Sequence, residues 1–226
     1  MFTIFNLDMF DFSSAMVFAA HPDDEIIGCG GTIAKYVDRG KAVDVVCVSS
    51  SGNEEERAVR GGEARRAAEF LGVRNLYFLG EPERFIDYNE KALKGAISIL
   101  RSSRPDIVFA PHSGEGDRDH RAVYDIVNEA VWIASSPHMQ DLGEKCDVRA
   151  LLLYEVWTPM DEPHVAEDVT GFMDRKIEAL GKHESQLSVI RYDEAAKGLN
   201  RYRGAMTGAG DYAEVFKIKF LKGSLV

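Results

Sequence analysis

Short apolar runs alternate along the chain with longer stretches in which apolar and charged residues repeat at helical spacing. The apolar runs are rich in Val, Ile and Leu, which is typical of strands buried on both faces. The longer stretches place Ala and Leu three or four positions apart, and Gly72 directly after one of them is a common helix end. The pattern predicts strands over residues 16–20, 42–49, 76–79, 107–110 and 150–157, and helices over residues 29–39, 54–71, 89–101, 120–134 and 169–187.

Alternating strands and helices predict an α/β fold, with a Rossmann-like and mostly parallel sheet that has helices on both faces. The length of 226 residues suits a single domain over residues 1–226. Residues 212–220 alternate well enough to add an edge strand. The segment 195–210 carries Tyr202, Arg203 and several glycines, and we expect a lid over a pocket, an ordinary loop or a contact between copies in a homo-oligomer.

Composition excludes several classes of partner. Hydrophobic residues make up 45% of the chain and charged residues 28%, so the chain is neither disordered nor fibrous. The net charge of −10 argues against binding to nucleic acid or to anionic membranes. No apolar run reaches the roughly 20 residues of a membrane span. Three distant cysteines, Cys29, Cys47 and Cys146, form no disulfide framework, so we expect a cytoplasmic protein.

The most unusual residues follow the first and fourth predicted strands. His21, Asp23 and Asp24 come directly after the first strand, and residues 111–120, with two histidines and three acids, come directly after the fourth. In such sheets ligands bind beyond the carboxyl ends of the strands, at the point where the strand order reverses. A strand order of 3-2-1-4-5 would place the reversal between these two strands, so the two loops should face each other.

Two imidazoles and one carboxylate with an open fourth position form the ligand set of a catalytic zinc site. His21 and Asp24 are three residues apart, and His120 would complete the set from the other loop. The side chain of Asp23 should point away from that of Asp24, because neighbouring residues diverge in a turn. Its carboxylate could then take a proton from metal-bound water, whose pKa zinc lowers to about 7. The alternative is that Asp24 and Asp119 are only helix caps; within a metal site, Asp119 would orient an imidazole.

The segment AHPDDE at residues 20–25, followed by Gly28-x-Gly30-Gly31, resembles the signature of the LmbE-like (PIG-L) family of zinc-dependent de-N-acetylases. The resemblance continues in the same order through most of the chain. It covers Arg60 with Glu63, Leu71 to Val73, Arg104 to Asp106, Asp119 to Val123, Tyr154 with Glu155, Lys176 with Ala179 and Leu180, His183 with Ser185 and Gln186, and Tyr212 to Phe216.

The resemblance implies one Zn²⁺ per chain, held by His21, Asp24 and His120, with Asp23 as general base. It implies hydrolysis of an N-acetyl group on an amino-sugar such as N-acetylglucosamine, or on a conjugate of one, to a free amine and acetate. Arg60 would contact the acyl group or the product acetate. Fe²⁺ or another divalent ion is the alternative metal.

Two positions depart from the family pattern. Many members carry a histidine three residues before the second zinc histidine, whereas this chain has Asp117, an acid that would repel an oxyanion if ionised. His112, at the start of the same loop, is the expected substitute as the residue that stabilises the oxyanion. Glu83 follows the third predicted strand where members often have Asp, which keeps the charge on a longer side chain.

The leading hypothesis is therefore a zinc-dependent N-deacetylase acting on a small N-acetylated sugar or conjugate. One alternative is hydrolysis of another amide-linked acyl group, on an antibiotic or a peptide-like metabolite, and a second is a non-catalytic module that binds metal or sugar. For Arg60 the alternative to a substrate contact is an ion pair with Glu56 or Glu63 on the helix surface. Trp157 and Trp132 are candidates for a sugar-stacking surface, with core packing as the alternative for Trp132.

Overall fold

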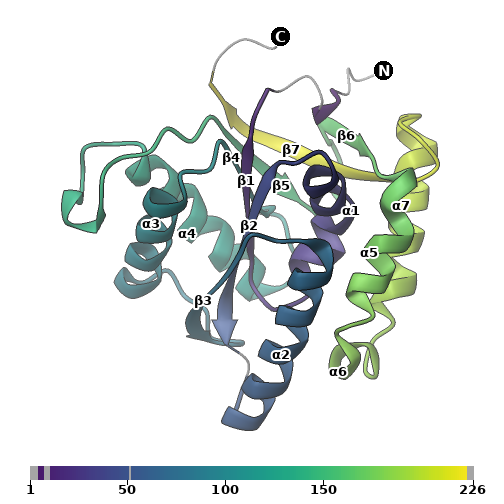
Figure 1. The fold of residues 1–226 in the computed structure, drawn as a ribbon, viewed down its shortest axis with the longest axis horizontal. Coiled ribbons are helices and arrows are strands. Elements are labelled where there is room, and N and C mark those ends of the chain that lie inside the picture. The colour runs from purple at the N-terminus through teal and green to yellow at the C-terminus, as the bar shows by residue number, and fades with distance from the viewer. Residues whose placement is uncertain (1–4, 8–10, 51, 223–226) are drawn as a thin grey trace.

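The computed structural model describes residues 5–7, 11–50 and 52–222. Within them, one sheet runs through the centre of the molecule (Figure 1). Its strands are β1 (Ser14–Ala19), β2 (Ala42–Ser50), β3 (Asn75–Pro82), β4 (Ile107–Pro111), β5 (Ala150–Tyr154), β6 (Val165–Asp168) and β7 (Ala213–Leu221). The order across the sheet is β3-β2-β1-β4-β5-β7-β6, with β1 to β5 parallel and β7 antiparallel to both of its neighbours. The predicted order 3-2-1-4-5 is confirmed.

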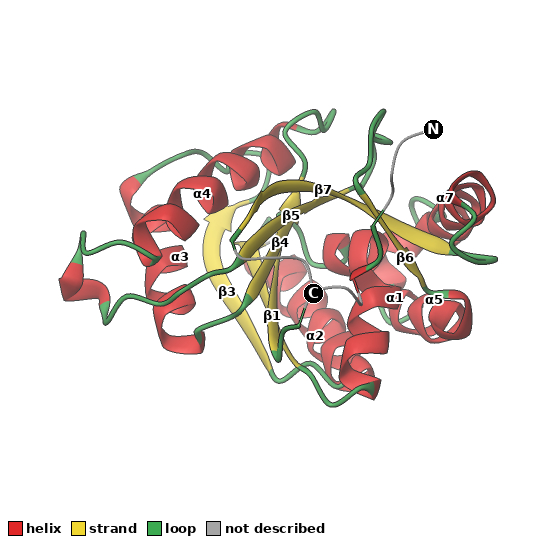
Figure 2. Ribbon diagram, turned by 90° about the horizontal axis from the view of Figure 1, so that it is seen from above, coloured by secondary structure: helices red, strands yellow, loops and turns green. Residues whose placement is uncertain are grey.

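Helices cover both faces of this sheet, as the view from above shows (Figure 2). Helices α3 (Glu90–Ser103) and α4 (Arg118–Ala134) lie on one face. Helices α1 (Asp24–Asp38), α2 (Glu54–Leu71) and α5 (Met173–Leu180) lie on the other, with α7 (Tyr192–Thr207) packed against α5. The short α6 (Glu184–Leu187) contacts α2. The expected α/β fold is confirmed.

The side chains of β1 explain why its sequence is an unbroken apolar run. Val17 packs in the core beneath α1, whereas Phe18 packs in the second core beneath α3 and α4. Successive residues of a strand point to opposite faces, and both faces of this strand are covered. Helix α2 matches its predicted bounds because both ends are capped: Asn53 accepts a hydrogen bond from the Glu56 N–H, and Gly72 takes the left-handed conformation.

The carboxyl-terminal third corrects three expectations. The single helix expected over residues 169–187 is wrong, because the segment divides into a 3₁₀ turn (Thr170–Phe172), α5 and α6. The strand expected at the edge, residues 212–220, is β7, which lies inside the sheet because the short β6 pairs with its outer side. Most of the segment 195–210 is the regular helix α7, not a loop. None of the helices in the described part of the chain is long and apolar enough to cross a bilayer.

Candidate metal centre

The loops that leave β1 and β4 meet at the carboxyl edge of the sheet. His21 follows β1, Asp24 begins α1, and His120 lies in the first turn of α4. One ligand atom from each of the three residues lies within 4.8 Å of the other two. The Asp24 Oδ2 atom is 3.3 Å from both His21 Nδ1 and His120 Nε2, and all three side chains are buried.

The chemistry of these three residues fits a divalent metal ion. Buried polar atoms nearly always have a hydrogen-bond partner, yet His120 Nε2 makes no well-directed hydrogen bond within the described residues. Burial alone would lower the pKa of His120, but the charge of Asp24 and the polar contacts with Asp24 and Glu115 together outweigh burial and raise the pKa to about 10. The position therefore attracts positive charge, and two imidazole nitrogens with one carboxylate oxygen are a common donor set for zinc.

Two carboxylates behind the imidazoles orient them. Asp119 Oδ2 is 3.1 Å from His21 Nε2, and Glu115 Oε2 is 3.3 Å from His120 Nδ1. Such partners fix which ring nitrogen faces a metal. The cap of α4 is Asp117, whose side chain accepts a hydrogen bond from the Asp119 N–H at 2.7 Å. Sequence reasoning did not single out Glu115, because nothing distinguishes it from the other acids of its loop.

Asp23 lies beside the three converging residues. Its backbone has φ 129°, an uncommon conformation for a residue other than glycine, and it precedes the first turn of α1. Strained backbone of this kind costs about 1–3 kcal/mol and gathers at functional sites. Burial raises the pKa of the Asp23 carboxyl well above its usual range, and the charge of Asp24 raises it further. A carboxyl with a raised pKa beside a metal site is suited to proton transfer.

The structure does not bring His112 into contact with the three converging residues. Its Nε2 donates to the Thr158 carbonyl oxygen at 2.7 Å, and its Nδ1 accepts from the Gly114 N–H at 3.2 Å. The ring reaches His120 only through Glu115, whose Oε1 is 3.3 Å from His112 Nε2. His112 therefore supports the loop that orients His120.

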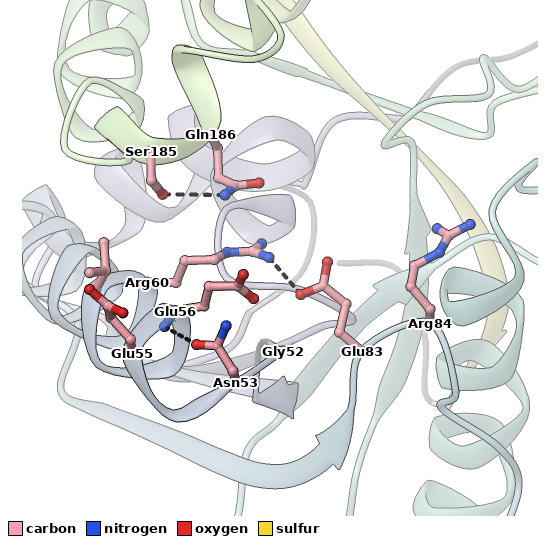
Figure 3. Close-up of a pocket in the computed structure, with 10 residues that line it drawn as sticks. Gly52, Asn53, Glu55, Glu56, Arg60, Glu83, Arg84, Ser185 and Gln186 are labelled. Atoms are coloured by element: carbon pink, nitrogen blue, oxygen red, sulfur yellow. Dashed lines mark hydrogen bonds and ion pairs between the residues drawn. The ribbon is translucent and has the colours of Figure 1, made fainter.

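Arg60 lies at a pocket next to the metal centre. Its guanidinium donates to Glu83 Oε2 at 2.6 Å, and Figure 3 shows the two side chains turned toward each other. The alternative pairing with Glu63 does not occur, because that carboxylate accepts two hydrogen bonds from Ser185 of α6. The pocket has a volume of about 680 Å³ and is lined by Gly52, Asn53, Glu55, Glu56, Val59, Arg60, Glu83, Arg84, Ser185 and Gln186.

Aromatic residues flank the centre on one side. The Trp157 ring lies 5.4 Å from the His120 ring, edge to face, and stacks with Tyr192 at 6.4 Å. Trp157 is half exposed, so its ring is available to a sugar face. Trp132 is exposed on α4 and next to His138, so the alternative that it packs in the core is wrong.

Comparison with known proteins assigns the family. Residues 16–131 match the PIG-L family model, described as GlcNAc-PI de-N-acetylase. The chain belongs to the PIG-L family. It is 30% identical to diacetylchitobiose deacetylase from Thermococcus kodakarensis, with 94% of this chain and 85% of that protein covered. It is 29% identical to 1D-myo-inositol 2-acetamido-2-deoxy-alpha-D-glucopyranoside deacetylase from Rhodococcus jostii, with 75% and 80% covered.

The fold of this PIG-L protein is also similar to that of a solved structure. N,N'-diacetylchitobiose deacetylase from Pyrococcus horikoshii matches with a TM-score of 0.80 and 28% identity, covering 92% of this chain and 84% of that chain. The resemblance drawn from the sequence motifs is thus confirmed, as is the expected class of hydrolytic deacetylase.

Proposed function

We propose that this PIG-L protein removes the N-acetyl group from an amino-sugar or an amino-sugar conjugate by metal-dependent hydrolysis. The observation that carries the proposal is the convergence of His21, Asp24 and His120 beside the buried carboxyl of Asp23. The names of its relatives support the substrate class, since one acts on diacetylchitobiose and another on an acetamido sugar linked to inositol.

His21, Asp24 and His120 would hold the metal ion, one Zn²⁺ per chain, with Fe²⁺ as the alternative. When bound, such an ion lowers the pKa of water and polarises a carbonyl group. Structural zinc sites are usually closed by four protein ligands, often cysteines. A set of three ligands with a spare carboxyl beside it supports a catalytic site over a structural one.

Asp23 would carry the proton that the reaction moves. Hydrolysis of the amide forms a bond from the water oxygen to the carbonyl carbon and breaks the C–N bond, so one water proton must reach the departing nitrogen. A carboxyl whose pKa is raised by burial is a stronger base than an ordinary carboxylate, which supports its taking the proton from water before it passes the proton to the nitrogen. Arg60, held by Glu83, would contact the acyl group or the product acetate from the pocket side.

Acetate release from a panel of N-acetylated sugars and conjugates, measured together with metal content, tests the proposal. We expect turnover with about one zinc per chain, loss of turnover on chelation, and recovery when zinc is added back. Asp23→Asn should retain the metal and lose at least about 10²-fold in kcat, the usual contribution of a general base. The control Asp125→Asn, on the exposed face of α4, should match the wild type.

Three outcomes would contradict the proposal. Full activity of Asp23→Asn would remove the assigned base. Turnover of acylated antibiotics or peptide-like metabolites, with none of the sugars, would replace the substrate class. A protein that binds zinc and sugars but hydrolyses none of the panel would be a binding module.

A further inference from the structure

Arg84 donates hydrogen bonds to two carboxylates near His21, those of Asp117 and Asp119. The Arg84 backbone N–H donates to Asp119 Oδ2 at 2.6 Å, and its guanidinium donates to Asp117 Oδ2 at 2.5 Å. Both carboxylates are buried, and one oxygen of each lies within 4.8 Å of a His21 ring nitrogen. The position of Arg84 is thus fixed at two points relative to the metal centre.

The backbone of Arg84 is in the left-handed region, with φ 67°. A side chain other than glycine, Asn or Asp is uncommon in this conformation, which is retained only when surrounding contacts hold it. Here the hydrogen bond to Asp119 and the tight turn from Pro82 to Phe85 hold it. The conformation directs a long cationic side chain along the wall of the pocket rather than into the core.

The guanidinium remains accessible while it is anchored. The Arg84 side chain is 63% exposed and its Asp117 partner 2% exposed. A guanidinium has five N–H donors, so the contact with Asp117 leaves donors available to a ligand in the pocket. Arg60, the other arginine of the pocket wall, is by contrast buried and paired with Glu83 (Figure 3).

Amide hydrolysis places negative charge on the carbonyl oxygen, and the side chains around this centre are mostly acidic. Asp23, Asp24 and Asp117 would all oppose that charge if they stood alone. His112 is turned to the Thr158 carbonyl oxygen and does not reach the three converging residues. Arg84 is a cation that is exposed, lines the pocket and is fixed to the buried Asp117.

We propose that Arg84 is a catalytic residue that stabilises the oxyanion formed on the acyl carbonyl, and that Asp117 is the positioning residue that holds it. This inference rests on the proposed function. Water adds to the carbonyl carbon, the π electrons move to the oxygen beside Arg84, and their return breaks the C–N bond. Arginine stays protonated in proteins, so Arg84 supplies charge and the proton for the nitrogen comes from Asp23.

The first experiment compares kcat and KM for the wild type, Arg84→Met, Arg84→Lys and the control Arg118→Met. Arg118 is an exposed arginine in the first turn of α4. We expect Arg84→Met to keep its zinc and to lose about 10²–10³-fold in kcat, the usual effect of one oxyanion donor. KM should change little, Arg84→Lys should recover part of the loss, and Arg118→Met should match the wild type.

Asp117→Asn tests the positioning role, because asparagine still caps a helix but lacks the charge that holds the guanidinium. We expect a smaller loss of kcat than in Arg84→Met, and no further loss when Asp117→Asn is added to Arg84→Met. A rise in KM with unchanged kcat in Arg84→Met would overturn the proposal, since it would mark a residue that binds substrate and transition state equally. Additive losses in the double variant would overturn the role of Asp117.

A binding measurement separates this inference from the proposed function. Glucosamine that carries a methylphosphonyl group on its nitrogen presents a tetrahedral oxyanion, and its Kd can be measured by calorimetry without turnover. Arg84→Met should weaken this Kd by the same factor as kcat/KM and leave the Kd of N-acetylglucosamine unchanged. If the wild type hydrolyses no sugar, the proposed function is wrong. If the wild type and Arg84→Met bind the phosphonate with equal Kd, the role of Arg84 is wrong, whether or not the enzyme hydrolyses sugars.

Discussion

His183 is expected to make the stability of the fold depend on pH. It precedes α6, is fully buried, and neither ring nitrogen has a hydrogen-bond partner in the described part of the chain. Burial lowers the pKa of His183 from 6.5 to about 4; the Glu63 carboxylate raises it, but the positive charges of Arg60 and Arg66 lower it further. The folded protein therefore holds this imidazole neutral at pH values at which the unfolded chain protonates it.

The sign and size follow from linkage between proton binding and folding. Above about pH 6.5 neither state binds a proton at His183, so the residue leaves stability unchanged. Between pH 6.5 and pH 4 only the unfolded state binds one, and stability falls as the pH falls. With a folded pKa of about 4, the loss between pH 7.5 and pH 5 is about 2 kcal/mol.

Urea unfolding at pH 7.5 and pH 5 measures this loss, with chelator present so that release of metal does not add to it. His183→Met removes the titrating group and keeps a side chain of similar bulk. The variant should lose about 2 kcal/mol less than the wild type between the two pH values, whereas the exposed control His138→Met should behave as the wild type. Equal pH dependence in wild type and His183→Met would refute the reasoning.

Three further substitutions test how packing affects stability, two at buried positions and one at an exposed position. Lys176 is fully buried and its Nζ donates to Glu214 Oε1 at 2.7 Å. Lys176→Met leaves that buried carboxylate without its cationic partner and should reduce the unfolding free energy by about 3–5 kcal/mol in denaturant titration. A Cβ at Gly28 would lie 2.7 Å from the Glu155 carbonyl oxygen, so Gly28→Ala should lower stability by about 1–3 kcal/mol. Gly198→Ala, in α7 with open space around it, should instead raise stability by about 0.5–1 kcal/mol, and the opposite order in thermal melts would contradict both assignments.

The part of the fold that could be predicted is the part governed by local pattern. Strands β1 and β4 are apolar runs because both of their faces are covered, and the capped α2 follows its sequence signals to both ends. Strand β6 escaped prediction because it is short and contains Glu167, an acid that suggests a loop. In the structure Glu167 is buried and pairs with Lys35 of α1 at 2.6 Å, a contact between residues far apart in the sequence.

The candidate site also has residues that the sequence could bring together and residues whose roles it could not predict. His21 and Asp24 share one turn, and His120 joins them because the strand order places the ends of β1 and β4 side by side, so pattern and topology suffice to bring the three together. The roles of Glu115 and Arg84 depend instead on side-chain directions that the sequence does not encode locally.

Asp117 shows why the electrostatic role of a site residue is hard to assign from the sequence. Taken alone, an acid at this position predicts repulsion of a developing oxyanion. In the structure its charge is matched by Arg84, which lies in a turn after β3 and reaches the centre only because its backbone is held at φ 67°. The pair is neutral overall and its guanidinium faces the pocket, so the position does not carry the net negative charge that its own residue type suggests. The electrostatic effect of a charged residue at a functional site can therefore be assigned only together with its partner, and here that partner comes from the turn after another strand of the sheet.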